Sequence, residues 1–331
     1  MLDVVGKTSR RVVPNGRVST TRGSNHAVSR ASKPPHEATE HLRALARRIV
    51  DAARERVPVR AALLTGSAAR GDADFYSDID LILYVDTVPR NAVVAHVREA
   101  VGGTNAVAKG EPTPYFCGEE FELQGVRTEL SFVALAWSES RLEELLERIE
   151  EFDSPFQKVL SGILEGLPLH GEALLERRRT RVRTYPEPLR RAMVERHWRF
   201  FPLWYYEEAI VARDAELWRL DILLESVFDL LAVLAALNRL YFTRFELKQL
   251  RVLVAKMTLA PPRLADRLES LFRLDPHAAA EELGRLVDET HALVAGELPE
   301  LELTLPFPPG TRQSPWSITT NAGGEDLRRS R

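Results

Sequence analysis

The sequence has almost no cysteine, little net charge and no long apolar run free of acidic residues. Its single cysteine, Cys117, excludes an internal disulfide framework and is typical of a protein kept in a reducing cytoplasm. The formal net charge of −3 argues against a general nucleic-acid binder. The most apolar stretch, residues 221–237, carries Asp221, Glu225 and Asp229 four residues apart, which predicts a polar stripe on an amphipathic helix. We therefore expect a cytoplasmic protein that does not enter a membrane.

Familiar catalytic motifs are missing as well. The sequence contains no G-x-x-x-x-G-K-[ST] element, which argues against a P-loop NTPase. Its 8 histidines show neither H-E-x-x-H nor a Cys/His metal spacing, so the sequence predicts no zinc site. We expect His197 to be a packed or surface residue.

The length of 331 residues predicts two domains. Residues 1–34 hold seven Lys or Arg against Asp3 alone, which indicates a disordered basic arm; a nucleic-acid-binding tail is the less favoured interpretation. Residues 35–180 are expected to form a mixed α/β domain with a small mixed sheet, and residues 181–300 an all-helical domain. Residues 301–331 are expected to be a flexible tail. The predicted fold class is thus α+β followed by an all-helical region.

Hydrophobic periodicity predicts the individual elements of both domains. In the first domain we expect helices at 36–57, 89–101 and 138–152, the last capped by Ser138, and strands at 58–67, 78–85 and, as a pair around Gln124-Gly125, within 115–135. Residues 180–189 are interpreted as a basic connector. In the second domain we expect helices at 187–212, 215–241, 244–257, 260–273 and 276–296.

Residues 66–85, GSAARGDADFYSDIDLILYV, place Asp78 and Asp80 at the start of an apolar strand. Acids two apart in a strand project from the same face and repel each other, so a bound divalent cation is the usual reason for the pattern. A Gly-Ser turn offers a phosphate free backbone N–H groups and a hydroxyl donor. Together these features favour Mg²⁺-assisted chemistry on a nucleoside triphosphate. Asp72 and Asp74 form a rival pair, but no apolar strand follows them directly.

The whole stretch LLTGSAARGDADFYSDIDLILYV resembles the nucleotidyltransferase superfamily of DNA polymerase β. Its elements GSAARG and SDIDL are similar to those of the minimal and small-molecule bacterial members. Residues 154–186 and 230–250 resemble, more faintly, the helical C-terminal domain of such enzymes. The resemblance implies transfer of a nucleoside monophosphate from ATP or another nucleoside triphosphate, with one or two Mg²⁺ ions as cofactor.

The family's metal site needs a third carboxylate from a neighbouring strand, and the resemblance assigns this place to Glu129 in GVRTELSFV. Asp78, Asp80 and Glu129 are thus the expected catalytic residues and metal ligands. Glu129 either ligates the second metal or takes the proton of the incoming hydroxyl. Glu120 and Glu122 in the preceding strand are the runners-up.

The resemblance also places the nucleotide. Gly66 and Ser67 are expected to hold the β- and γ-phosphates, and Arg70, one turn further, either contacts the triphosphate or is a solvated charge. Ser77 either binds the nucleotide or orients the turn before Asp78. Lys248 is a further candidate for a phosphate contact.

The remaining candidates concern the acceptor. The basic run 177–183 is expected to be a solvated face rather than an RNA contact, since no aromatic residues interleave with its charges. The aromatic segment 195–209 is expected to be mostly core, with residues 204–206 as candidates for an acceptor pocket.

Three functions are compatible with these residues. We expect a Mg²⁺-dependent nucleotidyltransferase acting on a hydroxylated, aminoglycoside-like small molecule. One alternative is a toxin-type or regulatory enzyme that modifies tRNA or protein, although nucleic acid is not the favoured partner. The other is a catalytically silent interaction module of the same fold. The sequence leaves the oligomeric state open.

Overall fold

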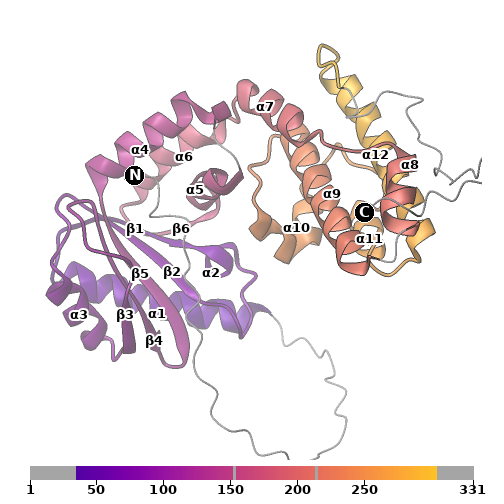
Figure 1. Ribbon diagram of the computed structural model, residues 1–331. Helices are drawn as coiled ribbons and strands as arrows, with labels where there is room; N and C mark the ends of the chain where they lie inside the picture. Colours follow the sequence, from indigo (N-terminus) through magenta and orange to yellow (C-terminus); the bar gives the residue numbers. More distant parts are fainter. Residues whose placement is uncertain (1–34, 152–153, 213–214, 304–331) are drawn as a thin grey trace, which may run out of the picture. The chain divides into compact units, whose positions relative to one another are not determined.

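A computed structural model of the chain describes residues 35–151, 154–212 and 215–303 (Figure 1). The expected basic arm at 1–34 and all but three residues of the expected tail lie outside the described residues. The chain forms two compact units: the first holds the residues up to Arg148 together with Val159–Thr184, and the second holds Ile149–Lys158 and the residues from Tyr185 onward. A mixed sheet in the first unit and helices in the second confirm the predicted fold class. The exact domain limits stay a prediction.

The first unit is built on a six-stranded sheet with the strand order β3-β4-β5-β2-β1-β6. The strands are β1 (Val59–Thr65), β2 (Ile79–Val85), β3 (Thr104–Ala108), β4 (Phe116–Leu123), β5 (Val126–Ala134) and β6 (Leu167–His170). The central strands β2 and β5 run parallel and all other neighbours antiparallel, so the sheet is mixed, as predicted. The edge strands β3 and β6 were not expected. Every residue of β3 is exposed and every residue of β6 is half-buried, so neither carries the buried alternation that reveals a strand.

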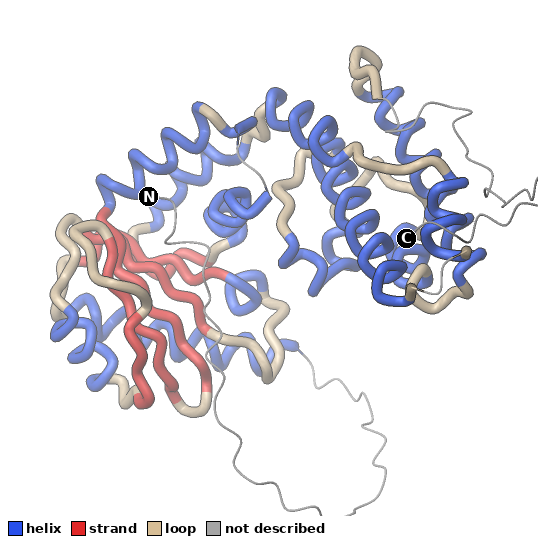
Figure 2. Tube along the Cα trace, viewed as in Figure 1, coloured by secondary structure: helices blue, strands red, loops and turns tan. Residues whose placement is uncertain are grey.

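Helices cover both faces of this sheet (Figure 2). They are α1 (Pro35–Arg54), α2 (Gly66–Arg70), α3 (Asn91–Ala100), α4 (Leu135–Glu147) and α6 (Glu172–Arg183). Apolar residues of α1 and α3 share the larger core with Leu81 and Leu83 of β2. The alternate residues Ile82 and Tyr84 point to the other face, where they pack in a smaller cluster with Leu175 of α6. The short helix η1 (Ile149–Glu151) and the helix α5 (Ser154–Glu165) follow α4, and the division between the two units falls within α5.

The predicted cap of the fourth helix was wrong. The helix begins at Leu135, directly after β5, and Ala134 occupies the cap position without a side-chain hydrogen bond. Ser138 lies inside the helix, where its hydroxyl accepts a hydrogen bond from Arg178 at 2.8 Å. The sequence pattern misplaced the helix start because strand and helix join here without a turn.

The basic run 177–183, expected to be a solvated face, lies wholly within helix α6 and is only partly solvated: Arg177, Arg181 and Arg183 are exposed, whereas Arg178 and Arg179 turn inward. Arg178 is buried, lies over the ring of Tyr84 at 4.5 Å and pairs with Glu139. Arg179 donates to the backbone oxygens of Ile163 and Gly166. These two arginines therefore link α6 to its neighbours in the first unit, since their guanidinium groups satisfy carboxylate and backbone oxygens.

The described residues of the second unit form helices joined by loops, with no strand among them. It contains α7 (Glu187–His197), α8 (Leu203–Tyr206), η2 (Glu207–Val211), α9 (Glu216–Leu237), η3 (Arg244–Gln249), α10 (Leu250–Ala255), α11 (Leu264–Ser270) and α12 (Pro276–Glu297). The C-terminal half of α9 is buried on every side, and α7 and α12 pack against this helix. None of the described helices has both the length and the hydrophobicity that a membrane span requires.

The acidic stripe predicted along α9 is only partly present. Glu225 pairs with Arg244 near the surface, but Asp229 is buried. Its carboxylate lies 2.7 Å from Nδ1 of the buried His197 and accepts a hydrogen bond from Arg199 at 3.1 Å. Asp229 can be buried because these polar partners replace water.

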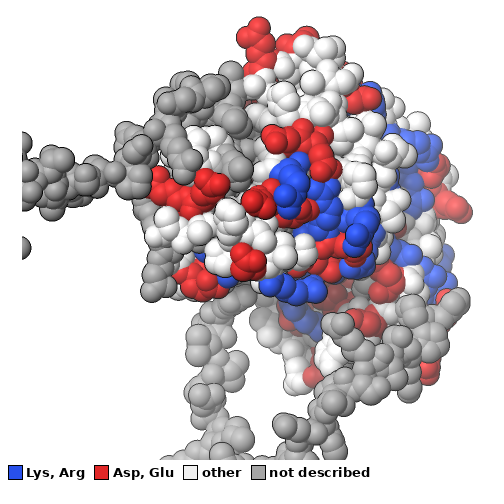
Figure 3. All heavy atoms as spheres, turned by 90° about the vertical axis from the view of Figure 1, so that its right-hand side faces the viewer, with Lys and Arg blue, Asp and Glu red and all other residues white. Residues whose placement is uncertain are grey.

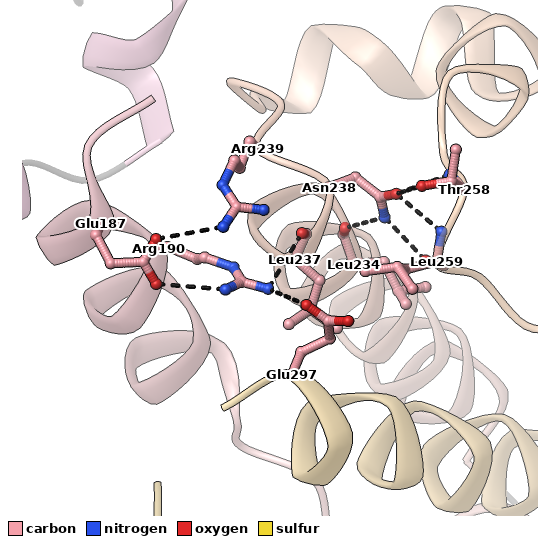
Figure 4. Close-up of polar contacts among 9 residues, drawn as sticks. All are labelled: Glu187, Arg190, Leu234, Leu237, Asn238, Arg239, Thr258, Leu259 and Glu297. Atoms are coloured by element: carbon pink, nitrogen blue, oxygen red, sulfur yellow. Dashed lines mark hydrogen bonds and ion pairs between the residues drawn. The ribbon is translucent and has the colours of Figure 1, made fainter. Parts of the chain in front are cut away.

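Two side chains tie the C-terminal end of α9 to its neighbours (Figure 4). Arg190 of α7, only 4% exposed, donates to the backbone oxygen of Leu237 at the end of α9 at 3.5 Å and to Glu297 of α12 at 2.8 Å. Asn238 accepts hydrogen bonds from the backbone N–H groups of Thr258 and Leu259 at 2.7 and 2.9 Å. Both contacts link segments far apart in the sequence, so they fix the packing of the helices.

Candidate functional site

Three carboxylates meet at one end of the two central strands. The parallel register sets Asp80 of β2 directly opposite Glu129 of β5, and Asp78 immediately precedes β2. Each of the three half-buried side chains offers an oxygen atom, and these atoms all lie within 4.8 Å of one another. No other group of three His, Cys, Asp or Glu side chains in the described part of the chain meets this spacing.

The Gly-Ser element packs against this cluster. Strand β1 ends at Thr65, which pairs with Asp80, and α2 begins at Gly66. Gly66 has φ +74°, and a Cβ atom at this position would lie 3.0 Å from Oδ2 of Asp80. Glycine is therefore favoured here both by its backbone conformation and by the close approach of the carboxylate.

Two cations contact the third carboxylate. Nζ of Lys109, the residue after β3, donates to Oε2 of Glu129, and Arg127 of β5 donates to Oε1 of Glu129 at 3.1 Å. Arg127 also binds both oxygens of Glu120 on β4, at 2.7 and 2.8 Å. The hydrogen bond to Glu120 and the negative charges of Glu129 and Asp78 raise the pKa of Arg127. The cluster is thus a network of opposite charges on one face of three neighbouring strands.

The rival aspartates are engaged elsewhere. Asp74 accepts hydrogen bonds from Ser77 Oγ at 2.9 Å and from the N–H of Tyr76 at 3.0 Å, which orders the turn before Asp78. Asp72 pairs with Arg70 at 3.3 Å. Neither aspartate belongs to the carboxylate cluster.

The other predicted site residues lie as follows. Ser67 is half-buried in the first turn of α2, and Arg70 at the end of that helix lies 3.8 Å from Glu165 in addition to its pair with Asp72. Glu122 accepts a hydrogen bond from Asn105. Lys248 belongs to the second unit, where its Nζ lies 5.8 Å from the ring centre of Phe245. Their roles in nucleotide binding stay predictions.

Sequence reasoning missed Lys109 altogether. It follows a fully exposed edge strand in the segment AVAKGEPTP, and nothing in that pattern points to a site. Arg127 had a usable signal, because strand alternation places it on the same face as Glu129. Its contact with Glu120 requires the β4–β5 register, which only the structure supplies.

Charges of opposite sign alternate over the face of the molecule in Figure 3. In the second unit, Arg251 pairs with Asp266 at 2.8 Å and Glu269 at 2.9 Å, and Arg267 pairs with Glu289 at 2.7 Å. Among the described residues on this face, such pairing offsets the positive charges that would attract a nucleic-acid backbone.

The donor set fits a hard divalent cation. Magnesium prefers oxygen ligands, and it is usually held by one or two carboxylates together with substrate phosphates and water. The three clustered carboxylates provide such oxygens, and Gly66 leaves the space beside Asp80 free of a side chain.

One family model agrees with this geometry. Residues 46–159 match the family model of the nucleotidyltransferase domain, a range that includes Gly66, both aspartates and Glu129. A nucleotidyltransferase-like protein from Exiguobacterium sibiricum, whose crystal structure is known, is 12% identical to this chain with a TM-score of 0.36, and the similarity covers 80% of this chain and 78% of that one. No curated protein sequence matches the chain.

Proposed function

We propose that this protein, a nucleotidyltransferase of the DNA polymerase β type, transfers AMP from ATP to a hydroxyl group of a small molecule. The observation that carries the proposal is the meeting of Asp78, Asp80 and Glu129 next to Gly66, inside the matched domain. The three carboxylates would hold one or two Mg²⁺ ions. A silent interaction module would not need to keep three mutually repelling acids at one end of its strands.

The proposed reaction is a displacement at the α-phosphorus of the nucleotide. The oxygen of the acceptor hydroxyl bonds to this phosphorus, and its proton passes to water. The bond from the α-phosphorus to the oxygen that bridges to the β-phosphorus breaks, and pyrophosphate leaves with that electron pair. The bound metal would supply charge stabilisation on the phosphate oxygens.

The chain's own residues would position the reacting groups. Gly66 and Ser67 would accept the β- and γ-phosphates, because the turn after β1 lies against Asp80 and carries no side chain at residue 66. Asp78 and Asp80 would fix the nucleotide through the metal at the end of β2.

A small acceptor is preferred to RNA for a specific reason. The basic run 177–183 was the main feature in favour of a nucleic acid within the described residues, and four of its five arginines bind carboxylate or backbone oxygens of the same unit. Arg178 and Arg181 pair with Glu139, and Arg183 pairs with Glu176. An aminoglycoside-like compound is the first acceptor to test.

The proposal is tested with purified full-length protein, Mg²⁺ and ATP labelled in its α-phosphate, in a bacterial lysate supplemented with aminoglycosides. Products are separated by size. Wild type should label a small molecule, and Asp80→Asn should lower the labelling by at least about 100-fold, because a neutral amide is a poor ligand for Mg²⁺.

Asp86→Asn is the matched control. Asp86 follows the opposite end of β2 and pairs with Arg60 at the surface, so this variant should keep the wild-type rate. Label on tRNA or on protein would show that the acceptor is a macromolecule and not a small molecule. Equal labelling by wild type and Asp80→Asn would refute the site.

A further inference from the structure

Lys109 reaches the site across a neighbouring strand. It follows β3 at the edge of the sheet, and its backbone N–H donates to the carbonyl oxygen of Gly118 on β4 at 2.9 Å. A Cβ atom at residue 118 would lie 3.5 Å from Cβ of Lys109, so the lysine stem passes beside a strand position that has no side chain. Its ammonium group contacts Glu129 on the far side of β4.

The charges of this cluster divide into two sets. Lys109 and Arg127 carry two positive charges and contact Glu129 and Glu120, which carry two negative charges. Asp78 and Asp80 add two further negative charges, which a single divalent cation would balance. Arg127 is shared between Glu120 and Glu129, whereas Lys109 pairs with Glu129.

We propose that the ammonium group of Lys109 competes with a divalent cation for the carboxylate of Glu129, and so sets how tightly the cluster binds metal before nucleotide arrives. The inference rests on the proposed function, since it takes the three carboxylates as the metal site. A metal ion on Glu129 must share that carboxylate with Lys109. At about 4 Å, Coulomb repulsion between a single and a double charge corresponds to roughly a thirtyfold loss of affinity even in water.

The test measures Mn²⁺ binding to the full-length protein without nucleotide, from the electron paramagnetic resonance signal of free Mn²⁺. Lys109→Met should bind Mn²⁺ at least about tenfold more tightly than wild type, because the competing charge is gone. Lys109→Arg keeps a cation at this position and should stay within about twofold of wild type. Arg47→Met removes a positive charge from an exposed position of α1, on the helix that packs against the opposite face of the sheet, and should also leave the affinity unchanged.

The variant Asp80→Asn distinguishes a failure of the Lys109 competition from a failure of the proposed metal site. If Asp80→Asn loses Mn²⁺ binding while Lys109→Met binds no more tightly than wild type, the competition is refuted and the metal site stands. If Asp80→Asn binds Mn²⁺ as wild type does, the cluster is not the metal site, and the inference falls with the proposed function. Thermal unfolding of each variant, monitored by circular dichroism, establishes that the protein compared is folded. Lys109→Gln serves in place of Lys109→Met if the latter fails to fold.

Discussion

Replacing Gly66 by alanine should disable the site while leaving the fold nearly intact. Gly66 has φ +74°, and the added Cβ would lie 3.0 Å from Oδ2 of Asp80. Ordinary contacts of a Cβ atom begin near 3.4 Å, so the carboxylate must move by a few tenths of an ångström. The left-handed backbone itself should cost alanine about 1–2 kcal/mol of unfolding free energy.

Gly102→Ala is the matched control. Gly102 has φ +78° and nothing within 4 Å of an added Cβ atom, so this variant carries the same backbone cost without a contact to the site. Urea unfolding should show a similar loss of about 1–2 kcal/mol for both variants. The difference between them then isolates the contact with Asp80.

Nucleotide transfer should fall by about 10- to 100-fold in Gly66→Ala, because catalytic groups tolerate displacements of only a few tenths of an ångström. It should stay within about twofold of wild type in Gly102→Ala, which leaves Asp80 in place. The measurement is the initial rate of label transfer from α-labelled ATP at saturating Mg²⁺. Equal rates in the two variants would refute the reasoning that Gly66 fixes the position of Asp80.

Two further predictions concern stability. Arg190→Met should lower the unfolding free energy measured in urea by about 2–3 kcal/mol, since it removes the charge-assisted hydrogen bonds that the buried guanidinium donates to Glu297 and to the backbone oxygen of Leu237. Arg191→Met, at the surface, should change it by less than about 1 kcal/mol. Equal losses in the two variants would contradict the role of burial. Burial alone would raise the pKa of Glu282, but hydrogen bonds from Arg267 and a second arginine hold it below its usual value of 4.5. The ionised Glu282 carboxylate contributes its full stabilisation above pH 4.5, and this contribution is lost as the pH falls through the lowered pKa. The unfolding free energy of wild type should therefore fall more steeply than that of Glu282→Gln between about pH 5 and pH 3. Parallel curves of unfolding free energy against pH would contradict this.

Much of the first unit could be predicted because its signals are local. The apolar run after Asp78 predicts β2, and Gln124-Gly125 predicts the β4–β5 hairpin, where both residues have positive φ. Where two elements join without a turn, as at Leu135, the local signal is missing and the helix start was misplaced. The edge strand β3 escaped prediction because an exposed strand needs no apolar alternation.

The sequence by itself indicates the chemistry that we expect of the candidate site. Asp78 and Asp80 at the head of an apolar strand, preceded by Gly66 and Ser67, indicate a phosphate and metal site from residue types and spacing alone. The resemblance to the nucleotidyltransferase superfamily assigned the third carboxylate to Glu129, which strand alternation places on the same face as Arg127.

Only the tertiary structure decided which groups meet there. The parallel register of β2 and β5 sets Asp80 opposite Glu129, and the passage of Lys109 beside Gly118 brings an edge-strand cation to the same carboxylate. The structure likewise buries Arg178 of the basic run beside Glu139, and Asp229 against His197. Contacts of this kind depend on strand order and helix packing, which bring together residues far apart in the chain. No hydrophobic periodicity in the sequence predicts such contacts.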